Sequence, residues 1–134
     1  MAYWIIKTEP GTYSFNDLER DKKTSWDGVR NYQARNNLKL MRVGDLALVY
    51  HSVGPKELVG IAEVTKTAYP DPTADDDAWV AVDVKFDRWL KHPVKLSRIK
   101  EERELFDLAL VKQGRLSVCP VSVKEWRILL KMSE

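Results

Sequence analysis

Residues 46–67 have the sequence LALVYHSVGPKELVGIAEVTKT, a pattern typical of two paired β-strands. Apolar side chains occupy both alternating sets of positions in 46–51, which predicts a strand covered on both faces. Gly54 and Pro55 favour a turn, and residues 58–67 form a second extended run. The middle of the chain is therefore predicted to be a β-hairpin.

Further strands are predicted on either side of this hairpin. Residues 3–7 are rich in aromatic and β-branched side chains and stop at Glu9-Pro10-Gly11. Residues 78–90 alternate Val80, Val82, Val84 and Phe86 with smaller or charged side chains. Residues 116–121 are extended but contain Pro120, which suits the edge of a sheet.

Helices are predicted between and after the strands, mainly from their capping residues. Ser14 and Asp17, and later Ser122 and Glu125, have the spacing of a capping box, and Asn31 can cap a helix over 31–41. Two shorter helical patches are expected, and the segment between the first two helices is expected to be a loop. These ranges are 96–102 and 104–111 for the patches and 22–25 for the loop.

Together these elements predict an α+β protein that forms a single domain over residues 1–134. About five strands would form a mostly antiparallel sheet that curls toward a barrel, with helices inserted between them and one at the end. No apolar run approaches the roughly 20 residues of a membrane helix, and the N-terminus does not resemble a signal peptide. We therefore expect no membrane association and a cytoplasmic location, or a nuclear one in a eukaryote.

Composition excludes several kinds of site. One cysteine allows no internal disulfide, and with two histidines it makes a closed metal site improbable, so no metal or cofactor is expected. Neither glycine-rich phosphate-binding motif occurs. The net charge of +2 is small, but basic residues gather in 85–100, either as a solvated face or as contacts for a nucleic-acid backbone. The candidates for such contacts are Arg88, Lys91, Lys95 and Arg98.

Aromatic residues give the strongest site signal, because five tryptophans are many for this length. Trp26 stands beside Asp27-Gly28, away from any periodic apolar face, which favours a binding role. Trp79 similarly lies where an acidic loop meets a strand. His51 and Ser52 do not form a catalytic pair, because neighbours on a strand point to opposite faces.

Three blocks of the sequence resemble one known family. They are WIIKTEP at 4–10, WDGVRNYQARN at 26–36 and YHS at 50–52, supported by AYPD at 68–71, VDVKF at 82–86 and RLS at 115–117. In this order they are similar to the signature blocks of the EVE domain family, essentially from end to end.

The resemblance implies a PUA-like fold, related to the YTH and ASCH domains, with a pocket for a flipped modified base such as methylated cytosine or adenine. By position, Trp26 would be the aromatic wall and Tyr50, His51 and Ser52 the opposite side. Trp79 is a candidate second ring, and Lys7 would approach the ligand or its phosphate. The backbone and polar edge beside the wall would come from Asp27, Gly28, Val29, Arg30 and Asn31.

Three functions stay open on these grounds. The first is a non-enzymatic reader whose partner is a nucleic acid with a modified base, alongside other proteins of a modification-dependent pathway. In that case we expect Trp26→Ala to remove most binding without unfolding the protein. The second is an enzyme acting on a nucleotide or modified base, with His51 or Asp27 as acid or base. The third is a structural or protein-interaction module.

Overall fold

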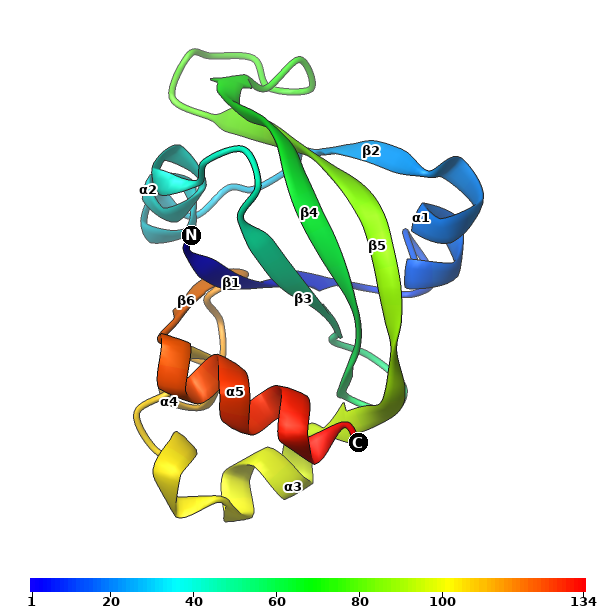
Figure 1. The fold of residues 1–134 in the computed structure, drawn as a ribbon. Helices are drawn as coiled ribbons and strands as arrows, with labels where there is room; N and C mark the ends of the chain where they lie inside the picture. The colour runs from blue at the N-terminus through cyan, green and yellow to red at the C-terminus, as the bar shows by residue number, and fades with distance from the viewer.

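A computed structural model describes all 134 residues, and its centre is a six-stranded mixed sheet in the order β2-β5-β4-β3-β1-β6 (Figure 1). Only β1 and β3 pair in parallel; every other pair is antiparallel. The strands are β1 (Tyr3–Thr8), β2 (Lys23–Trp26), β3 (Leu46–His51), β4 (Glu57–Pro70), β5 (Val80–Lys95) and β6 (Val118–Val121). The α+β class and the mostly antiparallel sheet are confirmed, whereas its curling toward a barrel stays a prediction.

The sheet has six strands where about five are predicted, because the predicted loop at 22–25 overlaps strand β2. Its residues Lys23 to Trp26 are mostly polar and partly exposed, so they lack the alternating apolar pattern that marks a strand. They are extended because they pair along β5, from Lys23 opposite Lys85 to Trp26 opposite Val82. Trp26 therefore ends a strand; it does not lie in an irregular segment.

The predicted hairpin is confirmed as β3 and β4, joined through Gly54, whose φ of +79° is the left-handed geometry that glycine permits. Both β4 and β5 are longer than expected, and their pairing shifts register at several points. Such irregularities accommodate extra residues and bend the strands.

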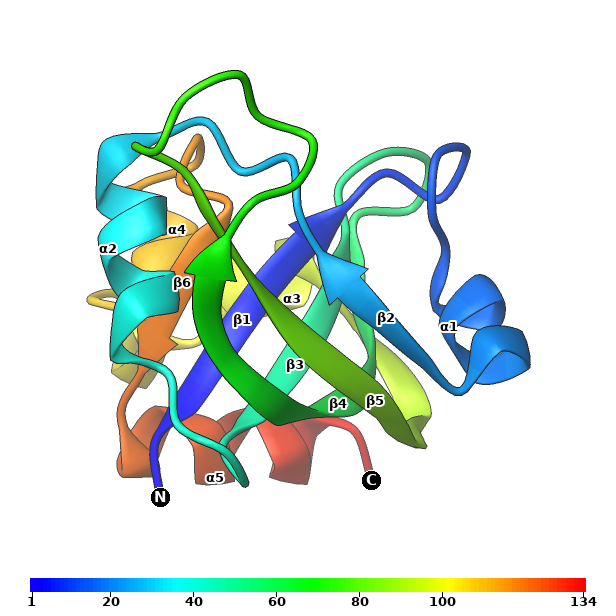
Figure 2. The ribbon, with the colours of Figure 1, turned by 90° about the horizontal axis from the view of Figure 1, so that it is seen from above.

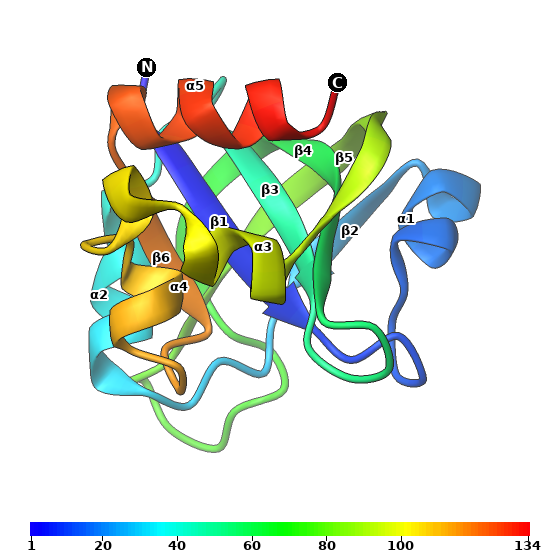
Figure 3. The same ribbon diagram turned by 90° about the horizontal axis from the view of Figure 1, so that it is seen from below.

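Helices cover the ends and one side of the sheet. They are α1 (Phe15–Asp21), α2 (Tyr32–Leu40), α3 (Leu96–Glu101), the 3-10 turn η1 (Arg103–Leu105), α4 (Ala109–Lys112) and α5 (Val123–Met132). Seen from below, α3, α4 and α5 lie on the same side of the sheet (Figure 3). The capping boxes at Ser14 and Ser122 and the Asn31 cap are all confirmed. No helix is both long and apolar enough to span a bilayer.

One core of 33 buried residues joins the sheet to its helices. Phe15, at the start of α1, packs so closely on β4 that a Cβ atom added at Gly60 would lie 2.0 Å from its ring. At the opposite end of the molecule the Tyr3 ring stacks on Trp126 of α5, with centroids 4.4 Å apart. The first residue of β1 thus packs against α5, whereas its last two residues, Lys7 and Thr8, line a cavity.

Candidate ligand pocket

The carboxyl ends of β1 and β2 approach one another (Figure 2). Residues at both of these ends line a hollow of about 430 Å³. We call it the first hollow. Its size is within the range of small-molecule sites. It is lined by Lys7, Thr8, Thr12, Tyr13, Thr24, Ser25, Trp26, Asp27, Gly28, Val29, Arg30 and Ser117. Six of the predicted site residues, Lys7 and the run from Trp26 to Arg30, therefore lie around one cavity.

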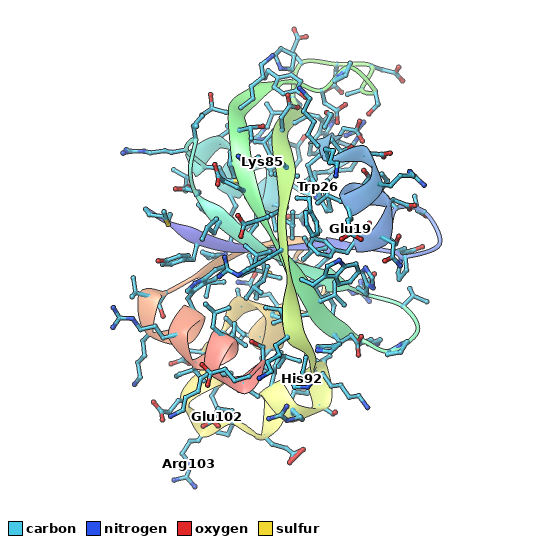
Figure 4. All side chains as sticks on the ribbon, turned by 45° about the vertical axis from the view of Figure 1, so that its right-hand side comes forward. Glu19, Trp26, Lys85, His92, Glu102 and Arg103 are labelled. Atoms are coloured by element: carbon cyan, nitrogen blue, oxygen red, sulfur yellow. The ribbon has the colours of Figure 1, made fainter.

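Two aromatic rings belong to this lining, Trp26 and Tyr13. Trp26 is 8% exposed and forms part of the core. Figure 4 shows it beside β5, on the side that carries α1. The Tyr13 hydroxyl donates to Asp21 at 2.9 Å, which fixes the second ring.

Asp71 holds the loop between β2 and α2 in shape. Its buried carboxylate accepts hydrogen bonds from the Gly28 amide and the Arg30 guanidinium, both at 2.9 Å, and from the amide and hydroxyl of Thr73. Burial alone would raise the pKa of Asp71, but these bonds outweigh it and keep that pKa well below the ordinary value. Gly28 has a φ of +77°, so the loop also requires a glycine there.

Asp27 is the only carboxylate in the lining, and its pKa is raised. Partial burial is the main cause, and the negative charge of Asp71 adds to it. Both disfavour the ionised form. Asp27 is thus a hydrogen-bond acceptor that becomes protonated more readily than an ordinary aspartate.

Lys7 forms the boundary between the first hollow and a second, smaller one. The second hollow, of about 220 Å³, is lined by Lys7, Tyr50, Ser52, Lys56, Leu96, Lys100, Leu110, Val111 and Gly114. The Lys7 ammonium donates to the Gly114 carbonyl at 2.9 Å, and burial lowers its pKa. Tyr50 and Ser52 therefore lie across Lys7 from Trp26 and line a different cavity.

His51 lines neither hollow. Its Nε2 accepts a hydrogen bond from the Phe15 amide at 3.2 Å, so the imidazole caps the start of α1. Burial lowers the pKa of His51, partly offset by Glu57, which favours this neutral acceptor form. The nitrogen that a catalytic base would use is already engaged by the backbone.

Trp79 and Asn31 also lie outside the first hollow. The Trp79 ring packs on Tyr32 with centroids 4.9 Å apart, and the Arg30 guanidinium lies 5.7 Å from the Trp79 ring centre. Asn31 accepts from the Ala34 amide at 2.9 Å as the cap of α2. The structure thus places both residues beside the loop that forms the hollow.

The four predicted backbone-contacting residues are dispersed. Arg88 pairs with Asp87 at 2.8 Å, and the Arg98 guanidinium approaches the Met132 carbonyl at 3.5 Å. Lys91 is exposed on β5. Of the four, only Lys95 lines a hollow, a third one described below.

Sequence reasoning missed several residues of the first hollow. Tyr13 carries no periodic signal, and the five hydroxyl side chains at 8, 12, 24, 25 and 117 come from four separate segments. Asp71 was treated only as part of an acidic loop, although its block was among those that resemble the family. The structure gathers no three His, Cys, Asp or Glu side chains that could hold a metal ion.

The chain as a whole is similar to proteins of one known family. A family model described as the EVE domain matches residues 2–132. The solved structure of Rpa0253 from Rhodopseudomonas palustris is 45% identical, covers 99% of this chain and 93% of its own, and has a TM-score of 0.93. Mouse thymocyte nuclear protein 1 is 34% identical over 98% of this chain and 74% of its own length.

One relative has been crystallised with nucleic acid. Human THYN1 protein in complex with 5-methylcytosine-containing DNA is 32% identical, with 100% of this chain and 98% of that chain covered and a TM-score of 0.93. The ASCH protein of Zymomonas mobilis is only 15% identical but has a TM-score of 0.62. This more distant likeness concerns the fold alone and agrees with a PUA-like architecture.

Proposed function

Because the chain belongs to the EVE domain family, we propose that it is a non-enzymatic reader that holds one flipped, modified base of a nucleic acid in the first hollow. The observation that carries the proposal is the cavity of about 430 Å³ in which Trp26 and Tyr13 stand beside Asp27. The human relative crystallised with 5-methylcytosine-containing DNA supports methylated cytosine as the first base to test.

The free energy gained by stacking the base can offset the cost of flipping it out of the strand. Flipping a base costs a few kcal/mol, and stacking on an aromatic ring returns about 1–3 kcal/mol. The first hollow offers two aromatic residues, and Lys7, which forms no salt bridge, can attract the phosphate charge; Arg30 is already paired with Asp71. Binding can therefore offset the cost of extracting the base.

Polar groups must supply most of the selectivity. Burying one extra methyl group contributes about 0.8 kcal/mol, which is roughly fourfold in affinity. An aspartate accepts well from the exocyclic amine of cytosine, and hydroxyls can donate or accept along the rest of the base edge. Asp27 and the hydroxyls of Thr24 and Ser25 are the groups in the lining suited to this role.

The site geometry favours a reader over an enzyme. His51 lies outside the first hollow with its Nε2 engaged by the Phe15 amide, so it is not placed as a base there. Asp27 has no histidine or cysteine among its neighbours in the lining. The lining holds no histidine or cysteine that could act as a base or nucleophile beside its hydroxyl groups.

The test is a titration of oligonucleotides that carry cytosine or 5-methylcytosine, single- and double-stranded, at one stated salt concentration. The expectation that Trp26→Ala leaves the fold intact must be corrected, because this indole is part of the core and its truncation would cost about 3–5 kcal/mol of stability. Trp26→Leu, checked for folding by circular dichroism and thermal unfolding, is the better variant. We expect it to weaken binding of the modified strand by about 5- to 100-fold.

The matched control is Trp89→Leu, which removes an indole that is 38% exposed, lies outside the hollow and donates to Glu19 at 3.0 Å. It should leave the affinity unchanged. Equal affinity of Trp26→Leu and the parent would refute the proposal. Mass spectrometry of modified nucleosides incubated with the protein tests the enzymatic alternative: a product whose formation requires Asp27 or His51 would show catalysis.

A further inference from the structure

Three hollows of this protein lie next to one another, because neighbouring hollows share lining residues. The first and second hollows share Lys7, and the second shares Lys56, Leu96 and Lys100 with a third. The third hollow has a volume of about 440 Å³ and is lined by Pro55, Lys56, Lys95, Leu96, Ser97 and Lys100. Lys7 lies at the first hollow, Lys56 and Lys100 line both the second and the third, and Lys95 lines the third alone; we call these four residues the lysine track.

The charges of the lysine track are not neutralised within the protein. No acidic side chain lines the second or third hollow, and none of the four lysines forms a salt bridge. Glu57 is the register partner of Lys95 in the sheet, yet no ion pair joins them. By contrast, Lys85, Lys112 and Lys124 each pair with a carboxylate.

The backbone fixes where these lysines lie. The Leu96 amide donates to the Lys56 carbonyl at 2.9 Å, which ties the loop before β4 to the start of α3. Figure 3 shows that loop next to α3. Lys100 is one helical turn beyond Leu96, and Lys7 is held by the Gly114 carbonyl. Backbone and helix contacts thus set the positions from which the lysine ammonium groups of the track extend.

We propose that the lysine track binds consecutive phosphates of the nucleic-acid strand whose base occupies the first hollow. This inference rests on the proposed function for its starting point, because the track begins at Lys7 in that hollow. A polymer with one negative charge per nucleotide matches a line of unpaired cations, and such contacts position a strand without reading its sequence. Leu96 and Pro55 are the only apolar residues that line the third hollow, and neither is an aromatic side chain of the kind that anchors a protein in a lipid surface.

The proposal replaces most of the backbone contacts expected from the sequence. Lys95 remains, whereas Arg88 already pairs with Asp87 and Lys91 lines none of these hollows. Lys56 and Lys100 take their place because the fold brings the turn before β4 against α3.

The test compares two triple variants that lose the same charge. The first is Lys56→Gln, Lys95→Gln and Lys100→Gln; Lys7 is retained because it also lines the first hollow. The control is Lys22→Gln, Lys39→Gln and Lys131→Gln, at exposed lysines outside every hollow described here. Affinities for single strands with cytosine or 5-methylcytosine are measured across a series of salt concentrations.

Loss of three phosphate contacts should make the slope of log K against log salt shallower by about 2 for a single strand. Affinity at low salt should fall at least about tenfold for both oligonucleotides, with their ratio unchanged, because phosphate contacts do not depend on the base. The control should keep the parent slope. A track variant with the parent slope, or a control that changes as much, would overturn the proposal.

The outcome also separates this inference from the proposed function. If the parent binds both strands equally, base reading fails, and the slope on the unmodified strand still decides the track. If only binding to phosphatidylserine vesicles depends on the three lysines, while the oligonucleotide slope does not, the track serves a membrane surface and the inference fails.

Discussion

Asp27 shows how one side chain can make base recognition depend on pH. It is the only carboxylate in the first hollow, and its pKa is raised above 3.8 by burial and by the nearby charge of Asp71. Protonation therefore begins at a higher pH than for an exposed aspartate. Only the ionised form offers both oxygens as acceptors to an amine of the base.

We predict that the affinity for a cytosine-containing strand falls in acid at a higher pH than an ordinary aspartate, with its pKa of about 3.9, would cause. Asp27→Asn keeps one acceptor oxygen and cannot titrate, so it should bind more weakly at pH 7 and show a flatter profile. Dissociation constants at constant ionic strength measure both curves. Parallel profiles for parent and variant would assign the pH dependence to the base itself.

At this scale the sequence identified the residues that are contiguous in the chain. The run from Trp26 to Arg30 was predicted and does line the first hollow. Tyr13 and Ser117 could not be predicted, because only the pairing of distant segments brings them to the same cavity. Trp79, predicted as a second ring, instead packs against Tyr32 outside it.

Among the elements, the loop between β2 and α2 depends on one residue of the loop between β4 and β5. Asp71 accepts from the Gly28 amide and the Arg30 guanidinium, and the Arg30 side chain is 39% exposed. Removing the negative charge would weaken the hydrogen bonds from Gly28, Arg30 and Thr73 to this buried position, and water can replace part of the loss because all three donor residues are exposed.

We predict that Asp71→Asn lowers the free energy of unfolding by about 2–3 kcal/mol at pH 7, with solvent screening at Arg30 reducing the effect. Because the folded pKa of Asp71 is depressed, its contribution is present above the unfolded pKa of about 3.9 and is lost as the pH falls through the lower folded value. The gap to the parent should therefore close only in acid, as measured by urea unfolding.

Asp75→Asn in the same loop is the matched control, since Asp75 is exposed and forms no salt bridge. It should change stability little at either pH. A loss as large as that of Asp71→Asn would mean that the loop needs negative charge in general, and not this one carboxylate.

Element prediction succeeded where the signal was local. The capping boxes at Ser14 and Ser122 and the cap at Asn31 depend on side chains within three residues of the backbone that they satisfy. Strand β2 failed because its polar edge sequence becomes extended only through pairing with β5. Similarly, β5 continues past the expected Leu90 to Lys95 because β4 provides a partner there.

For the whole molecule, the class of fold was predictable but the strand order was not. The β3–β4 hairpin is a local pairing, whereas the parallel pairing of β1 with β3 joins segments separated by α1, β2 and α2. That pairing brings the carboxyl ends of β1 and β3 together. It is the reason that Lys7 separates the Trp26 hollow from the Tyr50 hollow.

Because of this topology, the two ends of β1 have different roles: one end packs in the core and the other lines the first hollow. Tyr3 stacks on Trp126, which is 4% exposed, whereas Lys7 and Thr8 line the first hollow at the other end of the strand. We predict that Trp126→Leu lowers the free energy of unfolding by about 2–4 kcal/mol through lost packing. Below its melting range it should bind oligonucleotides within about twofold of the parent, since Trp126 lines none of the three hollows.

Urea unfolding and oligonucleotide titration on the same samples check both parts. Trp26→Leu provides the contrast, because that indole belongs to the core and also lines the hollow, so it should lose stability and affinity together. An affinity loss in Trp126→Leu as large as that in Trp26→Leu would show that packing under α5 is transmitted along β1 to the hollow. The two ends of the strand would then act as one unit.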